Sequence, residues 1–435
     1  MRLSRYVKIY PCGDGPGRLL LYYTLHGSTV LVPESFPAAI ENGSISPDDA
    51  KTLASLGILV PDSDKEKHEM REALAEANRL SRRFYAQAVV NMDCNLACTY
   101  CYEGGMKGHR YMSAGTADLL AELMERKGLD AGKDIEVCFY GGEPLMSDGL
   151  IISLSERLGA AATARGRKYT FNLVTNGTLL TPQAVDMLIP LGLTGAKVTL
   201  DGPRQNHDRF RPFLSGKGSF YAIIENMKMV CDRLKMQVGG NYTRDNYREF
   251  PLLLDFMLEE GLTPDRISMV QFVPVVKSGG KYAPPEFNEG CASVDEPWLA
   301  EAGLFLREEI LRRGFNTPRV GPSVCAIESC DDIVVNWDGA LYKCPAFLGW
   351  EGMEVGSLAT GIGDYTASHN LDVWKKDDCL DCAYLPLCFG GCRFLKLLRD
   401  GRIDDVDCRR TLLDATLEKC IRQDLRYRPR TGEGK

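Results

Sequence analysis

Cysteine content constrains this chain more than any other feature of its sequence. The 435 residues include 16 cysteines, and eight of them fall within residues 325–408, more than twice the number that an even spread would place there. Three more lie within residues 94–101. In a reducing compartment, clustered thiols more often bind metal than form disulfides. We therefore expect metal sites at both clusters, and we interpret the isolated Cys138 and Cys231 as core packing.

Composition limits the compartment and the partners. Hydrophobic residues make up 44% and charged residues 26% of the chain, and the formal net charge is −7. These values are typical of a globular protein and give no broad basic surface for nucleic acid. The first residues lack the apolar stretch of a signal peptide, and no apolar run approaches the roughly 18 residues of a membrane span. We expect a cytoplasmic protein with no nucleic-acid or membrane partner.

Strand and helix patterns alternate through the middle of the chain. Six apolar stretches read as strands, at 86–92, 135–140, 169–174, 196–200, 236–242 and 267–273. Amphipathic stretches between them read as helices, at 114–126, 150–164, 183–189, 220–234 and 247–259. This alternation predicts an α/β fold with a parallel sheet, either doubly wound or curled into a partial barrel. In such sheets the chemistry lies at the carboxyl ends of the strands.

The N-terminal segment has a different pattern. Short strands are expected at 5–10, 19–24, 29–32 and 57–60, with helices at 47–56 and 66–83. The segment 1–62 carries no catalytic motif. By size and pattern it is either a winged-helix-like module that binds a peptide by strand addition or a packing cap on the main domain.

The unusual residues follow the predicted strands directly. Cys94, Cys98 and Cys101 come after the first strand, and Gly141-Gly142-Glu143-Pro144 comes after the second. Three closely spaced thiolates can hold three corners of a 4Fe–4S cube and leave the fourth iron open for an amine and a carboxylate. The alternative is a structural zinc site, which would need a fourth ligand close by.

These motifs resemble the radical S-adenosylmethionine (radical SAM) superfamily. The cysteine loop with Tyr100, the GGEP motif, Thr175-Asn176-Gly177 and Leu200-Asp201-Gly202 followed by His207 and Arg211 occur in the order and spacing of that superfamily. The resemblance implies a catalytic cluster on Cys94, Cys98 and Cys101. It also implies SAM contacts from Tyr100, Gly141, Gly142, Glu143, Asn176, Thr199 and Arg211.

The C-terminal cysteines resemble a SPASM domain, a module that adds two auxiliary 4Fe–4S clusters to radical SAM enzymes. Carried over by this resemblance, auxiliary cluster I is bound by Cys325, Cys330, Cys344 and Cys392. Auxiliary cluster II is bound by Cys379, Cys382, Cys388 and Cys408. A pair of zinc sites is the alternative, because C-x2-C pairs also suit zinc. Cys12, Cys291 and Cys420 have no expected role.

The chain as a whole is most similar to radical SAM/SPASM maturases of ribosomally made peptides, of the geopeptide maturase type. The resemblance implies a partial (β/α)6 TIM-like barrel, three 4Fe–4S clusters, SAM, a precursor peptide as substrate and a donor such as flavodoxin or ferredoxin. It implies hydrogen abstraction by a 5′-deoxyadenosyl radical, with a second electron passing to auxiliary cluster I. We expect a thioether crosslink, with a carbon–carbon or carbon–oxygen link as the second choice.

Three alternatives stay open. They are a SPASM dehydrogenase, a maturase of folded proteins and, more distantly, a non-catalytic zinc-binding peptide scaffold. Sulfatase-maturing SPASM enzymes place a catalytic Asp directly after the third cysteine of this domain, where this chain has Pro345, so formylglycine chemistry is disfavoured.

The expected domains follow from these assignments. They are a peptide-recognition module at 1–62, a connecting helix at 63–85, the radical SAM core at 86–273, a less regular bridge at 274–324, the SPASM domain at 325–425 and a flexible tail at 426–435.

Overall fold

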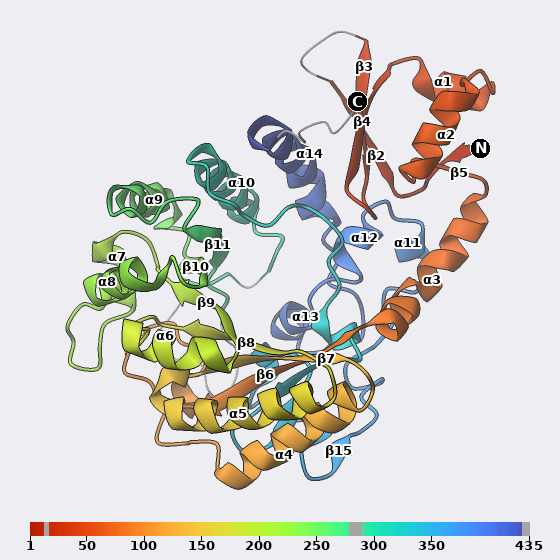
Figure 1. Cartoon of the computed structure of the whole chain (residues 1–435). Helices are drawn as coiled ribbons and strands as arrows, with labels where there is room; N and C mark the ends of the chain where they lie inside the picture. Colours follow the sequence, from red (N-terminus) through yellow and green to blue (C-terminus); the bar gives the residue numbers. More distant parts are fainter. Residues whose placement is uncertain (13–16, 278–288, 292, 429–435) are drawn as a thin grey trace.

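Six parallel strands form the centre of the molecule, as the sequence predicts (Figure 1). The structure is a computed structural model that describes residues 1–12, 17–277, 289–291 and 293–428. The six strands are β6 (Arg83–Asn91), β7 (Asp134–Gly141), β8 (Tyr169–Thr175), β9 (Leu193–Thr199), β10 (Lys235–Tyr242) and β11 (Ile267–Pro274). Each strand pairs in parallel with its neighbours in the sequence, so the strand order never reverses. A doubly wound sheet would reverse its order, and the partial barrel is therefore the correct alternative.

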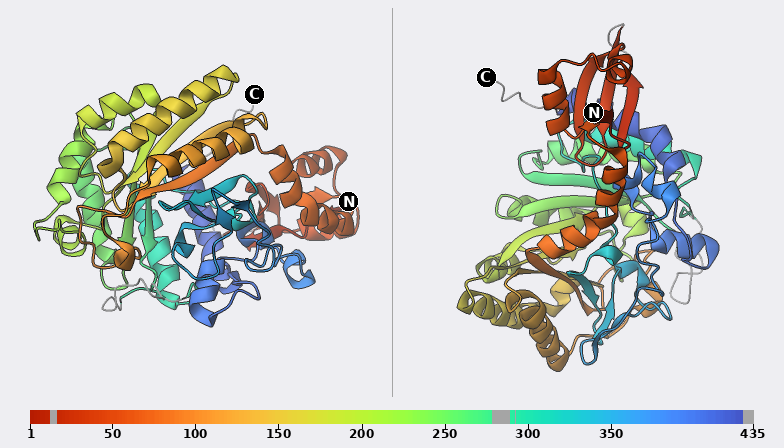
Figure 2. Two further views of the ribbon diagram at one scale, coloured as in Figure 1. Left: turned by 90° about the horizontal axis from the view of Figure 1, so that it is seen from below. Right: turned by 90° about the vertical axis from the view of Figure 1, so that its right-hand side faces the viewer.

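Helices cover the outer face of this sheet (Figure 2), whereas the inner face borders a cavity. The outer helices are α4 (Ala114–Met124), α5 (Asp148–Ala164), α6 (Pro182–Leu188), α7 (Arg204–Phe210), α8 (Phe220–Val230) and α9 (Phe250–Glu259). Alternation along the strands separates the two faces. In β9, for example, Ala196 and Val198 are buried in the main hydrophobic core, whereas Lys197 and Thr199 line a cavity on the other side.

The cysteine-rich C-terminal part extends the same sheet. Strand β12 (Asp332–Val335) pairs in parallel with β6, and β13 (Ala340–Tyr342), β14 (Gly356–Ser357) and β15 (Gly361–Ile362) follow it in antiparallel order. The sheet therefore has ten strands in the described residues. Helix α10 (Pro297–Arg312) precedes this part, and the helices within it are α11 (Asp377–Leu380), α12 (Leu385–Cys388), α13 (Arg393–Asp400) and α14 (Arg410–Tyr427).

The N-terminal part is a small antiparallel sheet with helices. Its elements are β1 (Arg2–Leu3), β2 (Val7–Pro11), β3 (Arg18–Tyr23), β4 (Ser28–Pro33), α1 (Phe36–Glu41), α2 (Pro47–Ser55), β5 (Leu59–Val60) and α3 (Ser63–Leu80). Strand β3 is central in the order β2-β3-β4. Leu21 belongs to a hydrophobic core that also contains Trp374, while Leu20 on the opposite face packs in a core with Tyr384 and Leu417. Both faces of β3 are thus buried, and the N-terminal part contacts the cysteine-rich part.

Three boundaries differ from the sequence-based expectation. The helix expected at 66–83 runs from Ser63 to Leu80, because Asp62 caps its start and Arg83 already belongs to β6. The bridge at 274–324 contains the long helix α10, whose buried Leu299, Ala302, Leu306 and Ile310 recur at helical spacing. Helix α14 continues to Tyr427, into the segment expected as a tail, and residues 429–435 lie outside the described residues.

Candidate active site

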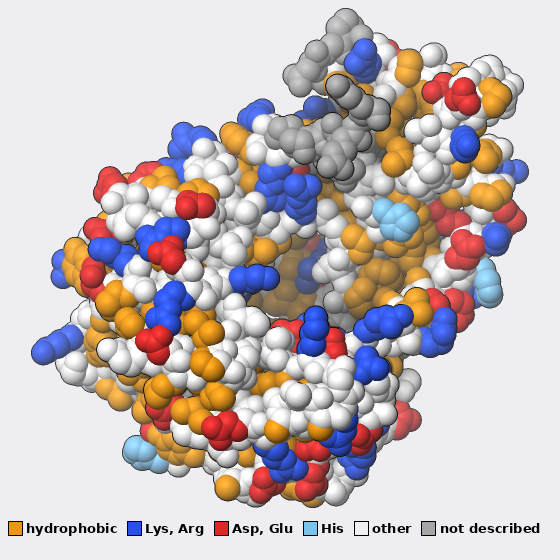
Figure 3. Space-filling model, in the orientation of Figure 1, with side chains coloured by type: hydrophobic (Ala, Val, Ile, Leu, Met, Phe, Trp, Pro, Cys, Tyr) orange, Lys and Arg blue, Asp and Glu red, His pale blue; other side chains and the backbone are white. Residues whose placement is uncertain are grey.

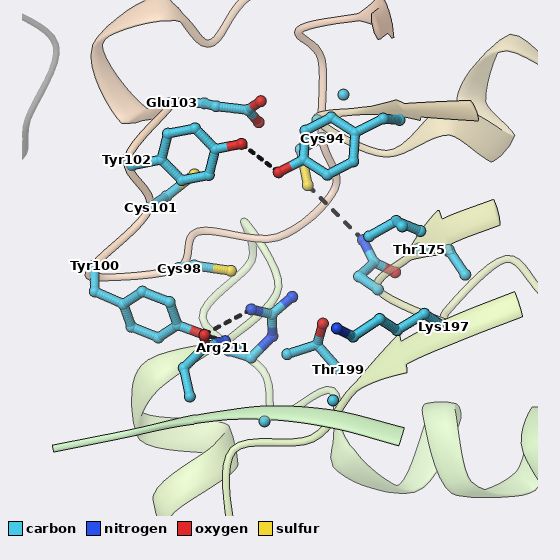
Figure 4. Close-up of a pocket in the computed structure, with 18 of the residues that line it drawn as sticks. Cys94, Cys98, Tyr100, Cys101, Tyr102, Glu103, Thr175, Lys197, Thr199 and Arg211 are labelled. Atoms are coloured by element: carbon cyan, nitrogen blue, oxygen red, sulfur yellow. Dashed lines mark hydrogen bonds between the residues drawn. The ribbon is translucent and has the colours of Figure 1, made fainter. Parts of the chain in front are cut away.

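Three cysteines lie on one loop directly after β6, at the carboxyl end of the barrel. The backbone N–H of Ala97 donates to the carbonyl of Pro212 at 2.8 Å, which fixes the loop against the chain that follows α7. Cys94 is buried, Cys98 and Cys101 are half-buried, and all three line one cavity of about 380 Å³ (Figure 4). The local folding of residues 92–102 therefore turns all three thiols toward the same space.

The surroundings of these thiols suit metal-bound thiolates. Burial raises the pKa of Cys94, and it raises the pKa of Cys101 to about 12, whereas the Lys107 ammonium acts in the opposite direction on both. Lys107 Nζ also donates to the carbonyl of Leu96 at 3.0 Å. Metal binding would deprotonate the thiols, and the nearby Lys107 ammonium would stabilise the resulting thiolates.

The donor set of this cavity fits the cluster that the sequence predicts. A 4Fe–4S cube takes thiolates at separate corners, and Cys94, Cys98 and Cys101 bring three thiols to one space. The assignment of these three cysteines to a cluster rather than to zinc stays a prediction.

Two glycines bring the end of β7 against the cysteine loop. A Cβ at Gly141 would lie 2.2 Å from the carbonyl oxygen of Asn91, and a Cβ at Gly142 would lie 2.1 Å from that of Asp93. No side chain fits at such distances. Both glycines line the cavity, so this approach exposes backbone beside Cys94.

Glu143 is fully buried beneath the same turn. Its Oε1 accepts hydrogen bonds from the hydroxyl of Thr175 at 2.8 Å and from the N–H of Leu145 at 3.1 Å, and its Oε2 accepts from the N–H of Asn176 at 2.8 Å. Burial raises the pKa of this carboxyl, and these donors act against the rise. Glu143 joins the ends of β7 and β8, and a direct contact with SAM stays a prediction.

The other predicted SAM contacts line the cavity. Tyr100, Gly141, Gly142, Asn176, Thr199 and Arg211 all do so. Asn176 Nδ2 lies 3.8 Å from the sulfur of Cys94. The hydroxyl of Tyr100 makes three hydrogen bonds. It donates to Asp201, and it accepts from Arg211 Nη1 at 2.8 Å and from Asn241 Nδ2 at 3.0 Å.

Several cavity residues were missed by sequence reasoning. They are Gln87, Tyr102, Glu103, Lys107, Tyr140, Val174, Lys197, Gly239, Gly240, Asn241, Gln271 and Val273. Strand alternation could have found Lys197, because it lies two residues before Thr199 and so shares its face. Glu103 gives no such signal, since its burial, which raises its pKa to about 7, depends on tertiary packing.

The cysteines predicted for auxiliary cluster I gather beside β12 and β13. Burial raises the pKa of Cys344 to about 12, and the neighbouring thiols of Cys325 and Cys392 raise it further. Cys330 is exposed, but its thiol and that of Cys325 both lie near the buried ammonium of Lys343. Both raise the pKa of Lys343, whereas burial lowers it. Three of the four thiols are thus mutual neighbours, and the fourth shares a neighbour with them.

The cysteines predicted for auxiliary cluster II surround a second cavity. Cys379, Cys382, Cys388 and Cys408 all line a space of about 620 Å³. They come from α11, from the segment between α11 and α12, from α12 and from the chain before α14. Four thiols around one space are the donor set that a 4Fe–4S cube needs.

The remaining cysteines lie apart from these groups. Cys231 is buried in the main hydrophobic core, as expected. Cys138 is also buried, but it lies on the opposite, inner face of β7, near Tyr85 and Lys197. Cys291 is also buried, whereas Cys12 and Cys420 are half-buried.

A search of the described residues finds no helix that is long and apolar enough to span a bilayer.

Comparison with known proteins gives the family of the central domain. Residues 89–257 match the model of the radical SAM superfamily. An Fe-coproporphyrin III synthase of Methanosarcina barkeri is 29% identical over 194 residues, a match that spans 43% of this chain and 42% of that relative. A cysteine-type anaerobic sulfatase-maturating enzyme of Clostridium novyi is 22% identical over 348 residues, which span 73% of this chain and 90% of that enzyme.

Two solved structures share the fold. The enzyme anSMEcpe with bound AdoMet and a Kp18Cys peptide superposes with a TM-score of 0.61 at 17% identity, over 79% of this chain and 97% of that one. Streptococcus suis SuiB bound to S-adenosylmethionine superposes with a TM-score of 0.54 at 16% identity, over 93% of this chain and 98% of that one. SuiB has also been solved with its precursor peptide SuiA, with a TM-score of 0.50. Residues 89–257 therefore form a radical SAM domain, in a chain that is similar in sequence to sulfatase-maturating enzymes and shares its fold with anSMEcpe and SuiB.

Proposed function

We propose that this enzyme modifies a ribosomally made precursor peptide and forms a thioether crosslink in it. One observation carries the proposal: the three thiols after β6 open into a cavity that continues along the polar inner face of the barrel. The fold is shared with two enzymes that have been solved with bound peptides. A carbon–carbon or carbon–oxygen link is the second choice of product.

Three sets of cysteines would hold the cofactors. Cys94, Cys98 and Cys101 would bind the cluster that meets SAM. Cys325, Cys330, Cys344 and Cys392 would bind auxiliary cluster I, and Cys379, Cys382, Cys388 and Cys408 would bind auxiliary cluster II. When bound, the reduced first cluster and SAM supply a 5′-deoxyadenosyl radical that removes a hydrogen atom from carbon. The reductant we propose is a small electron-transfer protein such as flavodoxin or ferredoxin.

The residues around the first cluster orient SAM and exclude water. The close approach of Gly141 and Gly142 places their backbone beside the cysteine loop, where the N–H of Gly142 donates to the carbonyl of Asn91 at 3.1 Å. Tyr100 is held by Asp201 and Arg211, which fixes its ring at the cavity wall. We propose that this ring lies against the adenine, and that Asn176, Thr199 and Arg211 contact the ribose or the carboxylate.

The shape of the molecule leaves room for a peptide. Figure 3 shows a deep hollow in the centre of the face drawn, between the barrel and the N-terminal and C-terminal parts. A peptide could reach the cavity from such a hollow. Strand addition at the edge of β4 would be a means of holding the rest of the precursor, because β4 pairs with β3 on one side and no strand among the described residues covers its other edge.

Maturation of a sulfatase is the second candidate, favoured by the sequence similarity to sulfatase-maturating enzymes. The residue after Cys344 is Pro345, which has no ionisable side chain. We therefore expect no formylglycine from a sulfatase-derived peptide.

The test is direct. Enzyme reconstituted anaerobically with iron and sulfide is mixed with SAM, dithionite and candidate precursor peptides. We expect one peptide to lose two hydrogens per crosslink, and fragmentation should place the link between a Cys sulfur and a carbon. Cleavage of SAM without a change in any peptide would contradict the proposal, and formylglycine in a sulfatase peptide would favour the second candidate.

A further inference from the structure

Four charged side chains line the active-site cavity, and three of them already have partners (Figure 4). Arg211 bonds to Tyr100, and Lys107 donates to Leu96 and lies beside the three thiols. Glu103 interacts with Lys107 and Tyr102. The fourth is Lys197.

The ammonium of Lys197 has no hydrogen bond or ion pair within residues 1–12, 17–277, 289–291 and 293–428. On the adjacent strand β8 it is paired with Val174, and Gln87 and Gln271 are further uncharged residues that line the cavity. Burial lowers its pKa, and the Cys138 thiol is the one group that acts against this. A ligand that supplies a counter-charge would stabilise a cation in this half-buried position.

The barrel makes room for this side chain. A Cβ built at Gly239 on the neighbouring β10 would lie 2.8 Å from Cε of Lys197 and 3.8 Å from its Nζ. The missing side chain at position 239 therefore lets the lysine lie along the inner face. In Figure 4 Lys197 extends into the cavity beside Thr199.

We infer that Lys197 binds the carboxylate of an Asp or Glu side chain in the target peptide and so selects the segment to be modified. The inference rests on the proposed function. A carboxylate is the anion that a peptide carries at neutral pH, since a free Cys thiol is mostly protonated there. SAM also carries a carboxylate, but Lys197 lies two residues before Thr199, about 7 Å further along β9 from the rim that holds the cysteine loop.

The first arm of the test separates these two carboxylates. The reconstituted full chain is prepared as wild type, Lys197→Met, Lys197→Arg and the control Lys168→Met, which removes an exposed lysine. The probe is the precursor peptide that the wild type modifies. Lys197→Met should lower kcat/KM for this peptide by about tenfold to hundredfold, the worth of a charged hydrogen bond, while Lys197→Arg keeps most of it and the control is unchanged.

SAM affinity and 5′-deoxyadenosine formation without peptide should stay unchanged in Lys197→Met. Weaker SAM binding in this variant would instead assign Lys197 to SAM and overturn the inference. Gly239→Ala offers an independent variant: it keeps the lysine but displaces its stem, so we expect a smaller loss of the same kind.

The second arm changes the peptide. The Asp and Glu residues of the modified core are replaced by Asn and Gln. For the wild-type enzyme this should lower kcat/KM by the same factor as Lys197→Met does, whereas the Lys197→Met enzyme should show no further decrease. Independent, additive losses would overturn the inference, as would a modified core that contains no Asp or Glu. Failure to modify any peptide by an enzyme that cleaves SAM would instead overturn the proposed function, and the inference with it.

Discussion

At the scale of single residues, Glu143 illustrates how one side chain can serve both fold and site. Its two oxygens accept three hydrogen bonds from Leu145 after β7 and from Thr175 and Asn176 at the end of β8. The GGEP motif identifies this residue in the sequence. Its bonds to Thr175 and Asn176 could not be predicted, because they depend on the pairing of two strands.

Glu143→Gln should lower both stability and SAM affinity while the iron content stays intact. An amide presents an NH2 group to at least one of the three donors, and a buried unsatisfied donor costs about 1–3 kcal/mol. The thermal midpoint and the SAM dissociation constant measure the two effects, with the exposed Glu156→Gln as the control. An unchanged midpoint would show that the three bonds contribute little.

His207 is a second residue whose burial has a measurable consequence. Its Nδ1 accepts from the N–H of Asp201 at 3.2 Å, and its Nε2 lies 2.9 Å from the hydroxyl of Ser219. That hydroxyl donates to the carbonyl of Arg211 at 2.6 Å, so Nε2 carries the proton and the ring is neutral. Burial, together with the charge of Arg211, lowers the pKa of His207 to about 3.

Acid should therefore destabilise the enzyme through this residue. Between pH 6.5 and 3, His207 is protonated in the unfolded chain but not in the folded chain, so the free energy of unfolding falls as the pH falls. From pH 7.5 to 5.5 the free energy of unfolding should drop by about 1.4 kcal/mol on this account. His207→Gln should be less stable at pH 7.5, and its deficit should shrink by that amount at pH 5.5. Parallel thermal midpoints would contradict this.

At the scale of elements, the turn before β12 connects the auxiliary cysteines to the sheet. Lys343 is buried, and its ammonium donates to the carbonyls of Ser329 and Asp332, on either side of Cys330. The backbone N–H of Cys330 also donates to Asn78 on α3 at 3.0 Å. The resemblance to a SPASM domain implies a fourth ligand here, and the structure shows which groups hold the backbone of this turn in place.

Cys330→Ala should alter the spectrum of one cluster or lower iron by up to about four atoms per chain, one cube. Cys344→Ala, at the centre of the same group, should do so at least as strongly. Cys420→Ala removes a half-buried thiol of α14 and serves as the control. Unchanged iron, spectra and activity in Cys330→Ala would mean that one iron of auxiliary cluster I has no cysteine ligand from this position.

Prediction of elements worked where the pattern is local. All six barrel strands were expected within a few residues, because apolar strands alternate with amphipathic helices. The pairing of β12 with β6 joins segments about 250 positions apart, which no local pattern shows. Helix α10 was missed although its buried residues recur at helical spacing, since the flanking sequence favoured an irregular bridge.

At the scale of the whole molecule, the N-terminal part is built into the cysteine-rich part. Tyr6 donates to the carbonyl of Leu380 at 3.0 Å, and Thr24 donates to that of Ala383 at 2.8 Å. Lys67 forms ion pairs with Asp377 and Asp381 at 3.0 Å each. Deleting residues 1–62 would expose the hydrophobic core that the N-terminal part shares with Trp374 and Leu380. The deletion could therefore abolish activity by destabilising the cysteine-rich part, and a loss of activity would not show a role in peptide binding.

A substitution at the strand edge is the better test of peptide recognition. Leu31 on β4 is 51% exposed, and a charged lysine on an edge strand opposes strand addition. Leu31→Lys should weaken binding of the full precursor while SAM cleavage without peptide and the thermal midpoint stay unchanged. Leu119→Lys, on the outer helix α4, is a matched control. Unchanged precursor affinity would leave the N-terminal part as a packing cap alone.

The most direct measurement of the central claim is 5′-deoxyadenosine formed from SAM by the anaerobically reconstituted, reduced enzyme. We expect formation by the wild type, and none by a variant in which Cys94, Cys98 and Cys101 are all alanine. That variant should retain the iron of the two auxiliary clusters, about eight atoms per chain. Formation of 5′-deoxyadenosine by the triple variant would contradict the assignment of these three cysteines as the SAM site.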